Sequence, residues 1–319
     1  MTDLPVRPGY IFVGGAPRSG TTLLQNMLDS HPDIIGGPEF LHLPDIMRLR
    51  RMMRRTLGNG WLDEYCSPAE ADAHLRQLID NFLLAIAGNR PAAYISEKTP
   101  ANIQVFADLA DLYPDARFIQ IVRDPRAVVA SMLKVGRRAR QKGIQTQAFT
   151  RSLVDAVHYV SACYADGMTF QPRGASTFLT VSYEDLVRDP GGLTRRICAF
   201  LDLPWDPKML RPDQVEHAGE KAITNDVWYS QEEYKRRPTD NAVDKWKDSL
   251  SFAQQAILYY CFSGNQPVRA NGYRLEKEFS SSLTGTPFYW VGCVLYAFLR
   301  MKTKIINQVK SLTRILAIH

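Results

Sequence analysis

Apolar and polar positions follow two periods along the chain, one typical of strands and one typical of helices. The short continuous apolar run at 10–13 predicts a buried strand, because glycines follow it at once and it is too short for a helix, and 117–122 (RFIQIV) predicts a second strand. Leucine, methionine and valine recur at helical spacing in 21–30 and 102–112, which predicts amphipathic helices. The first half of the chain therefore alternates between strand and helix.

The same rules extend this alternation through most of the chain. Further strands are predicted at 34–35, 93–95 and 177–181, and further helices at 43–56, 68–87, 126–135, 149–167 and 191–201. Strands that alternate with helices form parallel sheets with helices on both faces, and such sheets bind ligands at the carboxyl ends of their strands. We predict an α/β fold with three layers, in which helices flank a central parallel sheet.

The segment Gly15–Thr22, GAPRSGTT, joins the first strand to the first helix and has the G-x-x-x-x-G spacing of a P-loop. Its glycines let the backbone approach a phosphate, and the helix N-terminus supplies free amide groups and partial positive charge. The lysine that nucleotide triphosphatases use is missing, because Thr21 stands in its place and Arg18 supplies the cation instead. The sequence therefore predicts a P-loop-type fold that binds phosphate without a metal ion.

Two segments resemble the sulfotransferase superfamily that uses 3′-phosphoadenylyl sulfate (PAPS) as donor. PRSGTTLL after IFVGG is similar to its 5′-phosphosulfate loop, and RFIQIVRDPRAVVASMLK is similar to the strand, turn and helix that hold the 3′-phosphate. The resemblance implies that Arg123 and Ser131 bind the 3′-phosphate, and a forked cation beside a hydroxyl suits that anion. It also implies that PAPS is bound by the loop residues Arg18, Ser19, Gly20, Thr21 and Thr22.

Further segments resemble tyrosylprotein-type sulfotransferases, and together they extend the similarity from about residue 9 to about residue 274. They are 31–33 (HPD), 97–100 (EKTP), 181–187 with 189–190, and 241–246 (NAVDKW). By this resemblance Tyr183 lies near the adenine of PAPS and Lys245 lies near its phosphates.

The transfer step needs a base for the acceptor proton and cations for the leaving oxygen. Glu39 aligns with the catalytic glutamate in the GEETR segment of the tyrosylprotein branch, and we predict that it is the base. His31 and His42 are alternative bases, since other branches of the superfamily use histidine. We predict that Lys98 and Arg18 stabilise the leaving group.

The sequence also departs from the tyrosylprotein pattern. Leu41 stands where that branch has an arginine, and Gly36 and Glu97 stand where it has neighbouring cysteines. These departures favour transfer of sulfate from PAPS to a hydroxyl of a glycan, a lipid-linked molecule or a small molecule. A protein tyrosine is the alternative acceptor. A P-loop nucleotide kinase or triphosphatase is the alternative from a different class.

The net charge of +6 is unevenly distributed, because residues 279–319 carry five basic residues and no acid. The apolar run 287–299 would span about 20 Å as a helix, which is short of the roughly 30 Å core of a bilayer. Ile305, Val309, Leu312 and Leu316 then form one helical stripe flanked by cations. We predict a sulfotransferase domain over 1–278 and a tail over 279–319 that either lies on anionic lipid or packs on protein.

The remaining composition suggests where the chain works. Its five cysteines are far apart and form no CxxC pair, and no signal peptide is visible at the start. We therefore expect a cytoplasmic protein, with a peripheral position on the inner face of a membrane as the alternative that the tail suggests. We expect no nucleic-acid partner, and a homodimer stays open.

Overall fold

A five-stranded parallel sheet forms the centre of the first part of the structure. In the computed structural model, which describes residues 8–88, 90–170, 177–222, 226–234, 236–275 and 282–316, the strands are β1 (Gly9–Gly15), β2 (Ile34–Gly36), β3 (Tyr94–Lys98), β4 (Arg117–Val122) and β5 (Phe178–Ser182). They lie in the order β2-β3-β1-β4-β5, and every pairing is parallel. The predicted parallel sheet is confirmed.

Contacts divide the chain into two compact units. The first unit comprises the residues up to 123 together with 163–242, and the second comprises 124–162 together with the residues from 243 onward. The sheet lies wholly within the first unit. The predicted boundary between residues 278 and 279 falls outside the described residues and stays a prediction.

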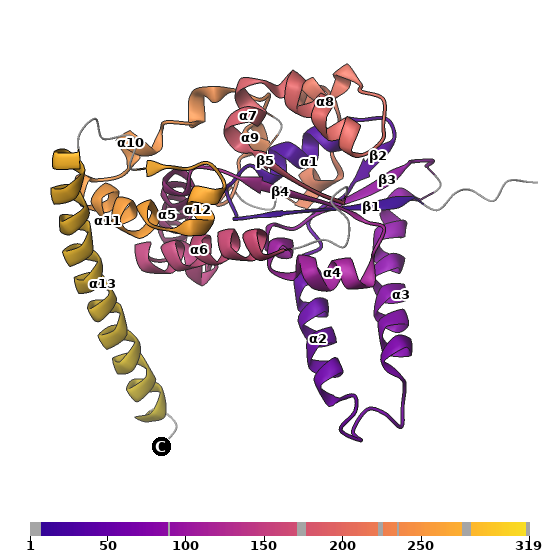
Figure 1. Ribbon diagram of the computed structural model, residues 1–319, viewed down its shortest axis with the longest axis horizontal. Coiled ribbons are helices and arrows are strands. Elements are labelled where there is room, and N and C mark those ends of the chain that lie inside the picture. Colours follow the sequence, from indigo (N-terminus) through magenta and orange to yellow (C-terminus); the bar gives the residue numbers. More distant parts are fainter. Residues whose placement is uncertain are drawn as a thin grey trace, which may run out of the picture. The chain divides into compact units, whose positions relative to one another are not determined.

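Helices cover both faces of the sheet in the first unit. Figure 1 shows α1 and α8 on one side of the strands and α3 and α4 on the other, which confirms the predicted three layers. The helices of this unit are α1 (Thr21–Asp29), α2 (Leu43–Thr56), α3 (Pro68–Ala87), α4 (Phe106–Leu112), α7 (Tyr183–Arg188), α8 (Pro190–Phe200) and α9 (Gln231–Tyr234), and α6 (Leu153–Thr169) begins in the second unit and ends in the first. Short 3-10 helices lie at Pro100–Val105, Pro207–Leu210, Pro212–Gln214, Ala218–Ala222 and Asp240–Ala242.

One predicted helix is divided in the structure. Residues 102–112 form the end of the 3-10 helix Pro100–Val105 and then α4, where the pattern predicts a single helix. The side-chain amide of Asn102 donates to the Val13 carbonyl and to the Glu97 carboxylate, so the first turns are held against β1 and β3. This tertiary anchor prevents a regular α-helix from starting before Phe106.

The second unit is helical in its described residues. It holds α5 (Pro125–Gln141), the first part of α6, α10 (Trp246–Ser249), α11 (Phe252–Ser263), α12 (Gln266–Ala270) and α13 (Ser282–Leu316), with a 3-10 helix at Ala148–Thr150. Residues 282–316 of the predicted tail form one helix, α13, which contains both the apolar run 287–299 and the positions of the predicted stripe. None of the helices in the described ranges combines the length and the hydropathy needed to cross a bilayer.

Helices α2 and α3 form an antiparallel pair that projects from the first unit (Figure 1). The buried guanidinium of Arg50 on α2 makes two hydrogen bonds to the Asp72 carboxylate on α3, of 2.7 and 2.8 Å. Asp108 and Asp111 of α4 lie 3.9 and 3.8 Å from the same guanidinium. The hydrogen bonds to Asp72 are the largest cause of a raised pKa for Arg50. One arginine therefore joins three helices.

Replacing Arg50 by methionine should destabilise this region. The substitution leaves Asp72 without its main partner, and breaking such a buried pair costs about 3 kcal/mol. The control is Arg48→Met, since half of the Arg48 side chain is exposed and its pair with Asp45 contributes little. Urea unfolding of both variants measures the difference. A loss for Arg50→Met no larger than that for Arg48→Met would show that Arg50 does not hold the helices together.

Candidate active site

The phosphate loop lies between the carboxyl end of β1 and the N-terminus of α1, as predicted. The Leu24 amide donates to the Gly20 carbonyl at 3.0 Å, so the helix begins directly after the loop. The first amides of such a helix have no partner within it and are available to an anion. The Ser19 hydroxyl is fully buried and has no hydrogen-bond partner among the described residues. This buried hydroxyl without a partner is suited to form a hydrogen bond with an oxygen atom of a ligand at the loop.

Gly20 is required by the shape of the loop. Its φ of 101° is in the left-handed region, and a Cβ atom there would lie 2.5 Å from the Tyr183 ring. Tyr183 itself is buried at the start of α7, directly after β5. The loop therefore rests on an aromatic ring that only a glycine can approach so closely.

Arg123 follows the last residue of β4 and is buried. Its guanidinium donates to the carbonyls of Arg18 (3.1 Å) and Ala242 (2.8 Å) and stacks on the Tyr183 ring at 4.1 Å. Its Nε has no hydrogen-bond partner among the described residues. Burial lowers the pKa of Arg123 from its ordinary value. A buried cation with such an Nε is suited to bind an anionic ligand.

A carboxylate and an ammonium group meet beside the loop. Lys98, the last residue of β3, is buried, and its Nζ lies 2.5 Å from Oε1 of the partly exposed Glu39. The same Nζ donates to the Thr22 hydroxyl at 3.2 Å. Burial alone would lower the pKa of Lys98, but the Glu39 carboxylate and nearby tyrosines outweigh it, and the pKa is raised. The predicted base and the predicted leaving-group cation therefore lie together at the phosphate loop.

The segment 226–234 covers this site. The sequence did not predict that this segment contacts the loop. The Thr22 hydroxyl donates to the Tyr229 hydroxyl at 3.0 Å, and Arg18 donates to the Trp228 carbonyl at 2.9 Å. The Arg18 guanidinium also lies 4.3 Å from the centre of the Tyr229 ring. The adjacent aromatic residues 228 and 229 could have drawn attention to this segment, but no spacing connects them to the loop.

Glu97 is a second residue whose role the sequence did not predict, because it stood out only as a difference from the tyrosylprotein branch. Its buried carboxylate accepts hydrogen bonds from the Phe40 amide (3.0 Å), the Thr99 hydroxyl (2.7 Å) and the Asn102 side chain. Burial raises its pKa to about 7. Because Phe40 follows Glu39, Glu97 positions the backbone that carries the predicted base.

The two histidines considered as alternative bases have other surroundings. His31 is buried, with Nε2 2.7 Å from the Pro204 carbonyl and Nδ1 accepting from the Asp33 amide. Both ring nitrogens of His31 therefore serve the fold. His42 is exposed at the start of α2.

Two predicted donor-binding residues belong to the second unit. Ser131 is half-buried on α5, and Lys245 is exposed directly before α10. Their roles stay predictions. The residues that the first unit places around the loop are Arg18, Ser19, Gly20, Thr21, Thr22, Glu39, Lys98, Arg123 and Tyr183.

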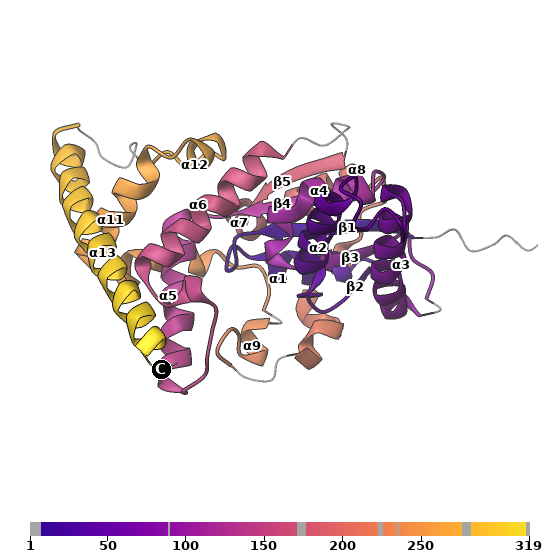
Figure 2. The ribbon, with the colours of Figure 1, turned by 90° about the horizontal axis from the view of Figure 1, so that it is seen from below.

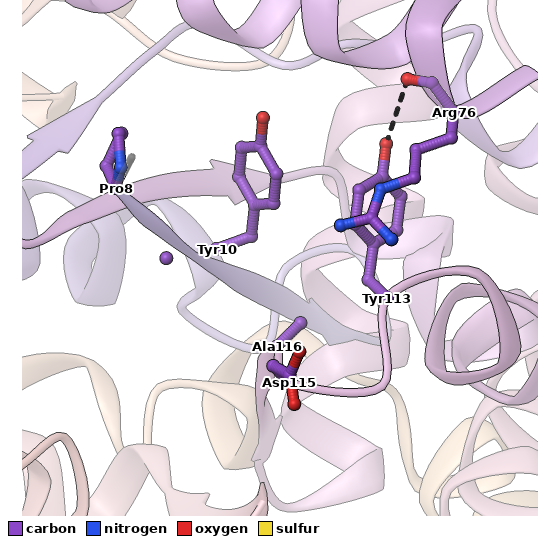
Figure 3. Close-up of a pocket in the computed structure, with 7 residues that line it drawn as sticks. Pro8, Tyr10, Arg76, Tyr113, Asp115 and Ala116 are labelled. Carbon is purple, nitrogen blue, oxygen red and sulfur yellow. Dashed lines mark hydrogen bonds between the residues drawn. The ribbon is translucent and has the colours of Figure 1, made fainter. Parts of the chain in front are cut away.

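A hollow of about 210 Å³ lies at the opposite, amino end of the strands in the first unit (Figure 3). The hydroxyls of Tyr10 and Tyr113, which line it, donate to the buried Asp80 carboxylate at 2.8 and 3.1 Å. Arg76 lies over the Tyr113 ring, 4.9 Å from its centre. Since these polar groups pair with one another, the hollow does not compete with the phosphate loop as the candidate site.

A parallel sheet with a lysine-free phosphate loop, a buried arginine after β4 and a Glu–Lys pair defines an α/β protein whose strand ends are suited to a phosphate-bearing ligand. A model described as "Sulfotransferase family" matches residues 8–207, more than half of the sequence. The chain belongs to the sulfotransferase family.

Individual sulfotransferases are also similar to this chain in sequence or in structure. Protein-tyrosine sulfotransferase 1 of Danio rerio is 31% identical over 247 residues, which cover 76% of this chain and 66% of that protein. The chain thus spans just under two thirds of the length of that relative. The sulfotransferase domain from the curacin biosynthetic pathway has a TM-score of 0.54 at 20% identity, over 77% of this chain and 92% of its own. A mouse sulfotransferase complexed with PAP has a TM-score of 0.52 at 16% identity, over 87% and 91%. Both structures share the fold.

The raised pKa of Glu97 predicts a specific pH dependence of stability. Because its pKa in the fold is about 7 and its ordinary value is 4.5, folding favours the protonated form. Its contribution is complete below about pH 4.5 and is lost as the pH rises through about 7. Over that window the wild type should lose roughly 3 kcal/mol more unfolding free energy than Glu97→Gln.

Urea unfolding at several pH values measures this difference. Glu64→Gln is the control, since Glu64 is an exposed glutamate in the connection between α2 and α3, and its profile should follow that of the wild type. Parallel profiles for the wild type and Glu97→Gln would contradict the assignment.

Proposed function

We propose that this chain transfers the sulfuryl group of PAPS to the hydroxyl of a protein tyrosine. The observation that carries the proposal is the Glu39–Lys98 pair, with 2.5 Å between Oε1 and Nζ, beside a phosphate loop that lacks the P-loop lysine. Protein-tyrosine sulfotransferases recur among the relatives of this chain, and they favour tyrosine over the other acceptors.

PAPS carries anionic groups that can bind the polar groups left without a partner in the first unit. When bound, PAPS supplies a sulfuryl group on a mixed anhydride and a separate 3′-phosphate. The amides at the start of α1 and the Ser19 hydroxyl would hold the 5′-phosphosulfate, and Arg123 would hold the 3′-phosphate with its free Nε. For Ser131 and Lys245, the proposed role in donor binding rests on the resemblance of their segments to the sulfotransferase pattern.

The Glu39–Lys98 pair can accept the proton of the acceptor hydroxyl and can stabilise the negative charge on the leaving oxygen. The carboxylate of Glu39 is partly exposed, so it can accept the proton of an incoming hydroxyl. Lys98 Nζ, already within reach of the Thr22 hydroxyl, can donate to the leaving oxygen at the loop, and Arg18 adds a second cation. These groups require no metal ion, and we propose a reaction that proceeds without one.

A hydroxyl of a glycan, a lipid-linked molecule or a small molecule is the second candidate acceptor. It is favoured by Leu41, which is 62% exposed close to Glu39 and stands where the tyrosylprotein branch has an arginine. An apolar side chain at that position suits a neutral acceptor better than an acidic one. Membership of the sulfotransferase family disfavours the kinase or triphosphatase considered at first.

Glu39→Gln should reduce kcat by about 100-fold or more, because general-base catalysis commonly contributes that much. Its affinity for adenosine 3′,5′-bisphosphate (PAP) should change little, since Glu39 is not assigned to the donor. Turnover of labelled PAPS and calorimetric titration with PAP measure the two quantities, and Glu64→Gln is the exposed control. Full turnover by Glu39→Gln would contradict the role of Glu39 and would favour His42 as the base.

Acceptor identity is tested with paired peptides. A tyrosine peptide should take up label from PAPS in the presence of a chelator, and the same peptide with phenylalanine should take up none. Small phenols, glycans and lipid-presented alcohols are assayed beside them. Labelling of one of these classes without labelling of the tyrosine peptide would replace the tyrosine proposal with the second candidate. Hydrolysis of ATP with no consumption of PAPS would overturn both.

A further inference from the structure

Helix α13 presents two different faces within the second unit. One face packs on α11, where the Phe288 ring lies 5.2 Å from that of Phe252 and the Tyr289 ring lies 5.0 Å from that of Tyr260. Gly292 lies on this face, and a Cβ atom there would lie 2.1 Å from the Ala256 carbonyl. The first half of α13 is therefore fixed to α11 (Figure 1), and Figure 2 shows the same two helices side by side.

The opposite face carries a continuous stripe of exposed apolar side chains. The stripe consists of Trp290, Val291, Val294, Phe298, Met301 and Ile305. Their spacing places all six within about 100° of the helix circumference. Trp290 is 60% exposed and Val294 is 67% exposed, so the packing of α13 on α11 does not bury these side chains.

Cations of α13 border the stripe, and the helix itself carries no acid. Lys302 and Lys304 are exposed and, at 100° per residue, lie just beyond its two edges. Arg300 lies further round, 6.0 Å from the centre of the Tyr296 ring. Residues 282–316 contain no aspartate or glutamate. An apolar stripe with lysine on both sides matches the boundary between lipid tails and anionic headgroups.

The Lys304 side of α13 is also hollowed. A cavity of about 860 Å³ lies between α6 and α13, and Arg300, Lys304 and His158 are among the residues that line it. Asp155 of α6 lines it as well. The cavity leaves room beside the stripe for a phosphate-bearing headgroup next to two cations.

We propose that α13 docks the chain on an anionic membrane surface through the stripe, without crossing the bilayer. The flanking charge decides between a membrane and a second copy of the chain. Two such helices placed face to face would bring their lysines together with no carboxylate on either helix to offset them, whereas lipid phosphates neutralise the same lysines. The proposal does not depend on the proposed sulfotransferase reaction.

Sedimentation with lipid vesicles tests the proposal on the full chain. The protein should bind vesicles of phosphatidylcholine with phosphatidylserine, and it should bind vesicles of phosphatidylcholine alone much more weakly. Lys302→Gln with Lys304→Gln should weaken binding to the anionic vesicles by roughly 10- to 30-fold, because each cation near such a surface contributes several-fold. Val294→Asp with Phe298→Asp should abolish binding.

Trp61→Asp is the matched control, because Trp61 is an aromatic residue in the connection between α2 and α3 that is more exposed than Trp290 or Phe298, and its loss should leave vesicle binding unchanged. Thermal melting confirms that each variant folds, and the lysine variant keeps the test valid if the aspartate variant does not. No binding to anionic vesicles, or equal binding to both vesicle types, would overturn the proposal. So would a wild-type dimer that binds no vesicles and that Val294→Asp with Phe298→Asp converts to a monomer.

Discussion

The buried guanidinium of Arg123 joins the parts of the first unit that surround the phosphate loop. It stands at the end of β4, holds the carbonyls of Arg18 in the loop and of Ala242, and stacks on Tyr183, on which Gly20 rests. A buried cation is costly, and backbone carbonyls offset only part of that cost. The sheet, the loop and the residues after β5 are thus organised around a positive charge that an anionic ligand would stabilise.

The same principle explains the chemistry proposed next to the loop. Parallel strands bring their carboxyl ends to one edge, and there β1 delivers the loop, β3 delivers Lys98 and β4 delivers Arg123. The only negative group that the described residues place against Lys98 is Glu39, which Glu97 holds through the Phe40 amide. A partly exposed carboxylate among buried cations is suited to take a proton while the cations meet the charge of a leaving group.

Local patterns predicted much of this arrangement. The runs at 10–13 and 117–122 and the GAPRSGTT loop identified β1, β4 and the phosphate site, because strands and helix starts depend on neighbouring residues. Long-range contacts could not be predicted from local patterns. The hydrogen bond from the Phe40 amide to Glu97 and the one from Thr22 to Tyr229 each join segments that are far apart in the sequence, and residue spacing does not reveal such contacts. The division of 102–112 arose in the same way, from the contacts of Asn102.

The central assignment is that Arg123 recognises the phosphate that distinguishes PAP from adenosine 5′-monophosphate. Calorimetric titration of the wild type and of Arg123→Met with both nucleotides measures it directly. The wild type should bind PAP about 100-fold more tightly than the monophosphate, and Arg123→Met should reduce that ratio by about 10-fold or more, since a charge-assisted contact with phosphate contributes about 1.5–3 kcal/mol. Equal affinity of the wild type for the two nucleotides, or an unchanged ratio in Arg123→Met, would contradict the assignment.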